Sequence, residues 1–112
     1  MFFATIEDFY DKISVQKALS VEAVKKYAEQ MKNGDANARQ CIIDNYLHFV
    51  ASFAMRHATG GKITLGLIYC CIEKLEKAVD SFDFEKSETN RDFVNYLSPY
   101  LRQAITNYIA NS

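Results

Sequence analysis

The string Lys77-Ala78-Val79-Asp80-Ser81-Phe82-Asp83 and the later string Tyr100-Leu101-Arg102-Gln103-Ala104-Ile105-Thr106 decide how this chain is expected to fold. The first string ends an apolar pattern that begins at Leu65, and the second lies in the last such pattern of the chain. Apolar residues recur in both patterns at intervals of three and four, as on one face of a helix. The same periodicity continues outward from both strings, and no strand pattern competes with it. We therefore predict an all-α protein.

Candidate capping residues divide the chain into helices. Thr5, Ser20, Asp35 and Thr64 each precede an apolar pattern, and each side chain can accept a free amide proton at a helix start. Gly34 can adopt the left-handed conformation that closes a helix. The helices predicted from these signals cover residues 6–18, 21–33, 36–58 and 65–81, and the third is expected to be the long central helix.

Pro99 interrupts the last predicted helix, residues 90–110. A proline inside a helix removes a backbone donor and clashes with the preceding turn, so either a kink or a fresh start is expected. Ser98 followed by Pro99 is a common pair of cap and first helical residue, which favours two abutting helices. The predicted fold is a compact helical bundle of five or six helices.

The composition is typical of one small cytoplasmic domain. The chain has 112 residues, of which 49% are hydrophobic, and this is enough for one core and not for two. Its formal charge is −1, whereas a free-standing nucleic-acid binder is usually basic, so strong autonomous DNA binding is not expected. No apolar run is long enough to span a bilayer, and residues 1–8 lack a signal-peptide pattern. We expect no membrane association.

The sequence contains no pattern typical of catalysis or of a bound metal. The three cysteines lack ligand spacing, and His48 and His57 are nine residues apart and point to different helix faces. Thr59-Gly60-Gly61-Lys62 lacks the spacing of a phosphate-binding loop and is expected to be a turn. We predict no catalytic residues, no metal site and no cofactor, and a protein that is not an enzyme.

Several strings resemble the sigma-seventy superfamily of bacterial RNA polymerase sigma factors. Tyr46-Leu47-His48-Phe49-Val50-Ala51-Ser52-Phe53-Ala54 is similar to the family pattern Asn-Leu-Arg-Leu-Val-x-Ser-Ile-Ala, and Leu65-Gly66-Leu67-Ile68 is similar to Leu-Asp-Leu-Ile. The two opening strings resemble the heart of the family's second domain. Leu19-Ser20 with Glu22, and the Gly34-Asp35 turn, resemble region one-point-two. The resemblance implies a single domain over residues 1–112, with 1–34 region one-point-two-like and 35–112 a region two-like core.

The resemblance implies a transcription initiation module that recognises the promoter minus-ten element in complex with RNA polymerase core. Such a module holds unstacked bases by stacking and by hydrogen bonds to base edges, while polymerase supplies most of the electrostatics. The family's paired tryptophans fall on Pro99 and Tyr100, so one aromatic residue remains of that pair. The residues expected to contact DNA are Phe93, Tyr96, Tyr100, Arg102, Gln103 and Thr106.

The helix that binds polymerase in this family departs from the family pattern. Gly66 replaces an Asp, and Tyr69-Cys70-Cys71-Ile72 replaces Gln-Glu-Gly-Asn. The replacement predicts an exposed apolar patch, which is typical of a protein interface. An alternative function is therefore a protein-interaction or regulatory module on the sigma scaffold, such as a mobile-element regulator without autonomous DNA binding. Its partner would be another regulator or a second copy in a homodimer. The residues expected at the polymerase or partner interface are Leu65, Ile68, Tyr69 and Ile72.

Overall fold

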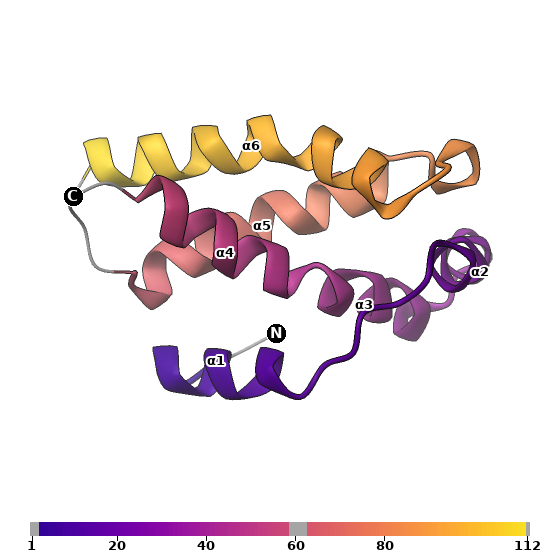
Figure 1. The fold of residues 1–112 in the computed structure, drawn as a ribbon, viewed down its shortest axis with the longest axis horizontal. Helices are drawn as coiled ribbons and strands as arrows, with labels where there is room; N and C mark the ends of the chain where they lie inside the picture. Colours follow the sequence, from indigo (N-terminus) through magenta and orange to yellow (C-terminus); the bar gives the residue numbers. More distant parts are fainter. Residues whose placement is uncertain (1–2, 59–62, 112) are drawn as a thin grey trace.

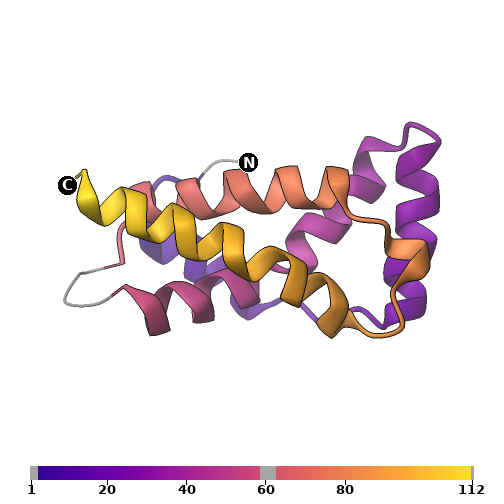
Figure 2. The ribbon, with the colours of Figure 1, turned by 90° about the horizontal axis from the view of Figure 1, so that it is seen from above.

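The computed structural model describes residues 3–58 and 63–111, and the predicted turn at residues 59–62 lies outside these ranges. In the described ranges the chain forms an all-α bundle, as predicted, with α5 and α6 side by side and α4 along them (Figures 1 and 2). α2 lies across one end of the bundle (Figure 2). None of the described helices combines the length and apolarity needed to cross a membrane. The elements are α1 (Ile6–Ser14), α2 (Val21–Lys32), α3 (Ala36–Asn45), α4 (Leu47–His57), α5 (Leu65–Ser81), the short 3-10 helix η1 (Phe84–Lys86) and α6 (Asn90–Ala110).

The predicted helix starts are confirmed by their capping bonds. The side chains of Thr5, Ser20, Asp35 and Thr64 accept hydrogen bonds from backbone amides three residues on, at distances of 3.0 to 3.2 Å. Gly34 has a φ of +95°, so it closes α2 in a conformation that a side chain would strain. Local side-chain chemistry therefore fixes where four helices begin.

The prediction of one long helix over residues 36–58 is wrong, because the chain breaks at Tyr46 into α3 and α4. The Tyr46 amide bonds to the carbonyl of Ile43, three residues back, at 3.1 Å and not to the residue four back. This tighter turn accompanies burial of the Tyr46 ring, which is 4.5 Å from the ring of Phe93 on α6. The break at Tyr46 thus coincides with a contact to Phe93 on α6, and the apolar pattern of residues 36–58 does not indicate it.

The prediction of two helices meeting at Pro99 is also wrong, because α6 continues through it as one helix. Ser98 does not cap a new helix; its hydroxyl instead donates to the Val94 carbonyl at 2.7 Å. Leu97 and Leu101 are fully buried on either side of Pro99, which itself is exposed. Packing of this unbroken apolar face against α5 outweighs the local cost of proline.

The first helix ends at Ser14 and not near Ala18 as predicted. Beyond it, the backbone of Leu19 is held from two sides. Its amide donates to Asn45 Oδ1 at 2.8 Å, and its carbonyl accepts from Asn90 Nδ2 at 2.9 Å. The Tyr46 hydroxyl also reaches Asn90 Oδ1, at 3.4 Å. We name these contacts the Leu19 latch; it ties the α1–α2 connection to α3 and to the start of α6.

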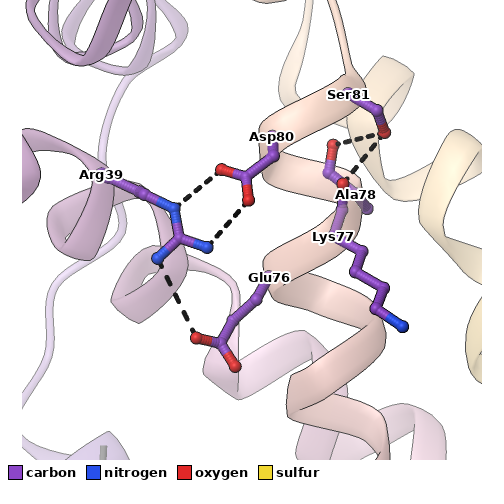
Figure 3. Close-up of polar contacts among 6 residues, drawn as sticks. All are labelled: Arg39, Glu76, Lys77, Ala78, Asp80 and Ser81. Atoms are coloured by element: carbon purple, nitrogen blue, oxygen red, sulfur yellow. Dashed lines mark hydrogen bonds and ion pairs between the residues drawn. The ribbon is translucent and has the colours of Figure 1, made fainter. Parts of the chain in front are cut away.

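Arg39 joins α3 to α5 through two carboxylates (Figure 3). Its Nε and Nη2 atoms donate to Asp80 at 2.7 and 2.9 Å, and its Nη1 atom is 3.9 Å from Glu76. The hydrogen bond to Asp80 raises the pKa of Arg39. Lys77 points away from this cluster in Figure 3 and pairs with Glu73 instead. The acidic residues of α5 are therefore divided between a bridge to α3 and a solvated pair.

Replacing Pro99 by alanine is expected to stabilise the protein. The Pro99→Ala variant regains a backbone donor inside α6 without changing the buried face, and the gain is about 1 to 3 kcal/mol in the free energy of unfolding. Urea unfolding followed by circular dichroism measures it. Pro99→Gly is the matched control and should gain roughly 1 kcal/mol less, because glycine weakens a helix interior. Loss of stability in Pro99→Ala would mean that α6 needs the proline.

Stability is expected to fall at alkaline pH because two acidic groups are buried. Burial raises the pKa of the Cys71 thiol and of the Tyr46 hydroxyl, each to about 12. The unfolded chain therefore loses these protons at lower pH than the folded chain does. The free energy of unfolding is constant below their ordinary pKa values and falls above pH 9 by about 1.4 kcal/mol per pH unit for Cys71 alone.

Urea unfolding at about pH 8 and about pH 10 tests this dependence. Cys71→Ala should remove most of the loss between these two values, because Tyr46 contributes mainly at higher pH. Cys70→Ala keeps Cys71 and should behave like the wild type. Equal stability of the wild type at both pH values would contradict the expected cost of ionising the buried thiol.

Candidate nucleic-acid interface

Four of the six residues expected to contact DNA lie exposed on α6. These are Tyr100, Arg102, Gln103 and Thr106, and the Tyr100 ring is 42% exposed. Gln103 is one helical turn from both Tyr100 and Thr106, so the three side chains share one side of the helix. Together they offer an aromatic face and two hydrogen-bonding groups to the solvent.

Tyr100 continues a row of aromatic rings that begins in the core. Ring centroids are 5.0 Å apart between Phe84 and Phe93, 5.3 Å between Phe93 and Phe82, 5.1 Å between Phe82 and Tyr96, and 5.5 Å between Tyr96 and Tyr100. Such contacts fix the rings relative to one another. The exposed tyrosine at the end of the row is therefore supported from beneath.

Tyr96 is half-buried and connects the core to the surface. Its hydroxyl is 2.8 Å from the Ser81 hydroxyl at the end of α5. Hydrogen bonding with the Tyr96 side chain raises the pKa of Tyr100. Ser81 therefore belongs to this site. It was missed in the sequence, because a single serine at a helix end carries no recognisable motif.

Phe93 does not reach the surface, which corrects its expected place in a DNA contact. Its side chain is 1% exposed and packs against Tyr46, Phe82 and Phe84. Phe93 lies on the buried stripe of α6, which faces the rest of the bundle. Gln103 lies outside that stripe and is exposed. Phe93 supports the aromatic row instead of presenting a face to a ligand.

Two hollows flank the exposed end of this row. One, of about 430 Å3, is lined by residues that include Phe82, Asp83, Lys86, Asp92 and Tyr96. A smaller one, of about 150 Å3, lies against Tyr100 and is lined by Lys74, Lys77, Ala78 and Ser81. Planar rings could enter beside either tyrosine.

The cationic groups around the first hollow are partly neutralised within the chain. Lys86 is 3.8 Å from Asp83, and Lys32 is 3.2 Å from Glu85. In the described part of the chain Arg91 and Arg102 form no ion pair, and both are exposed. They are the cations of α6 best placed to meet a phosphate.

Asp92 caps the start of α6 by binding the two backbone amides that precede the helix. Its Oδ2 atom accepts from the amides of Glu88 and Thr89, at 2.7 and 3.2 Å, and these bonds lower the pKa of Asp92. The Asp92 carboxylate is thus part of a capping box that fixes where α6 begins. The described residues also contain no cluster of His, Cys, Asp or Glu able to hold a metal ion.

The second expected surface, at the start of α5, is not an open apolar patch. Ile68 and Ile72 are 0% and 3% exposed, and Leu65 and Tyr69 are half-buried. The expectation of exposure is wrong because the Tyr69 hydroxyl bonds to the backbone of Phe3, which places the start of the chain over this turn. The Tyr108 hydroxyl of α6 lies 2.7 Å from where a Cβ atom of Gly66 would be, so α6 approaches this turn from another side.

Comparison of this chain with known proteins finds RNA polymerase sigma factors. No family model matches it. Over 93 residues it is 39% identical to the RNA polymerase sigma factor SigA of Clostridium acetobutylicum, a match that covers 83% of this chain and 24% of that protein. This chain is related to the sigma-seventy family. A sigma factor SigA of a Bacillus species is 34% identical over 93 residues, with the same shares covered. The chain thus spans about a quarter of the length of the curated sigma factors it matches.

The structure separates the six residues that the sigma-seventy resemblance assigns to DNA by their burial. The six residues expected to meet DNA lie on α6, yet they divide into exposed side chains, the half-buried Tyr96 and the buried Phe93. Sequence resemblance alone treats these six alike, because a motif does not report burial. The geometry separates residues free to meet a ligand from residues that hold them.

Alanine substitutions should separate the supporting aromatic residue from the exposed one. Phe93→Ala is expected to lower the free energy of unfolding by about 3 to 5 kcal/mol, because it leaves a cavity in the core. Tyr100→Ala should cost less, about 1 kcal/mol, since Tyr100 is 42% exposed whereas Phe93 is 1% exposed. Urea unfolding of both variants measures the difference. Similar costs would show that Tyr100 also belongs to the core.

Proposed function

We propose that this chain is a sigma-factor-like transcription initiation module whose α6 contacts the promoter minus-ten element in complex with RNA polymerase core. The observation that carries the proposal is the exposure of Tyr100, Gln103 and Thr106 together on one side of α6. The relationship to sigma factors gives this surface its expected ligand.

The chemistry of this surface suits unstacked bases. A base can stack on the Tyr100 ring, which the row beneath it holds in place. Gln103 can donate to and accept from a base edge, and the Thr106 hydroxyl can do the same one turn further on. Arg102 is exposed beside them and can meet a phosphate. Tyr96 takes part mainly by positioning Tyr100.

RNA polymerase core is the proposed partner that makes binding strong. A formal charge of −1 supplies little attraction for DNA, so this chain would contribute selectivity while polymerase supplies most of the affinity. By resemblance, the contact with polymerase lies at the start of α5, where Leu65 and Tyr69 are the accessible members of the expected interface. The buried Ile68 and Ile72 would support that surface from within.

We also propose that the whole chain acts as one unit. Residues 1–34 would correspond to region one-point-two and residues 35–112 to region two. α2 packs closely on α3 and η1, and the Leu19 latch joins the two parts through Asn45 and Asn90. The alternative, an interaction module without DNA contact, rests on an exposed apolar patch, but two of the four residues of that patch, Ile68 and Ile72, are buried.

Binding of a fork-junction promoter fragment in the presence of core polymerase tests the proposal. Gln103→Ala should weaken binding by about fivefold or more, the discrimination expected of one good base contact. Thr106→Ala should weaken it to a smaller extent. Fluorescence anisotropy of labelled DNA measures both.

Asn37→Ala is the matched control, because it removes an exposed amide from α3 and leaves α6 intact. It should bind like the wild type. Binding that is equal in all four proteins would contradict a base contact by α6, and absence of polymerase binding would contradict the module as a whole.

A further inference from the structure

The start of the chain is bound to α5 through its backbone. The Tyr69 hydroxyl accepts a hydrogen bond from the Phe3 amide at 2.7 Å and donates one to the Phe3 carbonyl at 2.9 Å. Phe3 precedes α1 and lies outside any helix. The Tyr69 hydroxyl thus binds both backbone polar groups of Phe3, its amide and its carbonyl.

Aromatic contacts close the same junction. The Phe3 ring is 5.2 Å from the ring of Phe9, edge to face, and 6.3 Å from that of Tyr69, stacked. Phe3 is consequently buried although it lies near the chain terminus. The segment is seated in an aromatic site and does not merely trail over the surface.

The rest of this segment joins the core through a few buried side chains of α1. α1 lies apart from the other helices in Figure 1 and packs on them less closely than α2 to α6 pack on one another. Its buried residues are Phe9 and Ile13, and its ion pair in the described structure joins Lys12 to Asp44 at 3.7 Å. Opening α1 would expose Phe9 and Ile13, so the closed state is the main population and the open state a minor one.

The connection after α1 is suited to act as a hinge. Residues 15–20 are not helical, and Val15 is 80% exposed. The chain is fixed again at Leu19 by its bonds to Asn45 and Asn90. Residues 3–14 can therefore swing away while α2 and the rest of the bundle remain in place.

We propose that residues 3–14 form a displaceable strap over the Tyr69 face of α5, which competes with RNA polymerase core for that face. The strap closed on Tyr69 is the inhibited state, and opening frees the Tyr69 ring and hydroxyl one turn from Leu65. This inference rests on the proposed function, because it names the regulation of the surface assigned there to polymerase. The strap reduces the apparent affinity for polymerase by the fraction of molecules that are open.

Two measurements on the full chain test the strap. Hydrogen exchange followed by mass spectrometry reports opening of α1 without any partner, and a titration with core polymerase reports affinity. Phe3→Ala alters the strap and leaves α5 unchanged. It should raise exchange in α1 about tenfold or more, because a buried ring is lost, and should tighten polymerase binding by the same factor. Val15→Ala, which shortens an exposed apolar side chain at the end of α1, should change neither.

Tyr69→Phe keeps the ring and removes both hydrogen bonds to Phe3, so it should also raise exchange in α1. Circular dichroism checks that each variant keeps its helices, and Tyr69→Phe serves if Phe3→Ala fails to fold. Unchanged exchange in α1 would overturn the strap. Faster exchange with unchanged polymerase affinity would overturn its regulatory role. No polymerase binding by any variant would overturn the proposed function and this regulation with it, while the exchange data would still show whether the strap opens.

Discussion

The packing of α6 along α5 is the contact on which the rest of the structure depends. The buried face of α6, which includes Leu97, Leu101 and Ile105, runs along one uninterrupted helix. Because apolar burial over this length outweighs the loss of one backbone hydrogen bond at a proline, α6 stays continuous. That continuity fixes the side of α6 that faces outward, and with it the placement of Gln103 and Thr106.

Polar contacts then place the remaining helices against this pair. Arg39 holds α3 on α5 through Asp80, and the Leu19 latch holds the α1–α2 connection through Asn45 and Asn90. α1 joins the core through the buried side chains of Phe9 and Ile13. The strap proposed for residues 3–14 lies over the Tyr69 face of α5 and not over the exposed surface of α6.

The sequence predicted the helix starts well and the helix breaks poorly, for one physical reason. Capping by Thr5 or Ser20 is a contact within one turn, so the local sequence contains all of it. The break at Tyr46 and the continuity at Pro99 depend on partners in distant helices. The candidate site shows the same division: a motif indicated six residues, but only burial against Tyr46 and the neighbouring rings sets Phe93 apart from them.

The sequence by itself determined the helical class, the capped starts, the near-neutral charge and the resemblance to sigma factors, because each is a property of residue types and short spacings. The tertiary structure alone decided which of those residues reach the solvent. It placed Tyr100 at the end of an aromatic row and Phe93 within it, and it laid Phe3 across Tyr69. These outcomes depend on contacts between residues as many as 66 positions apart, which no local pattern encodes.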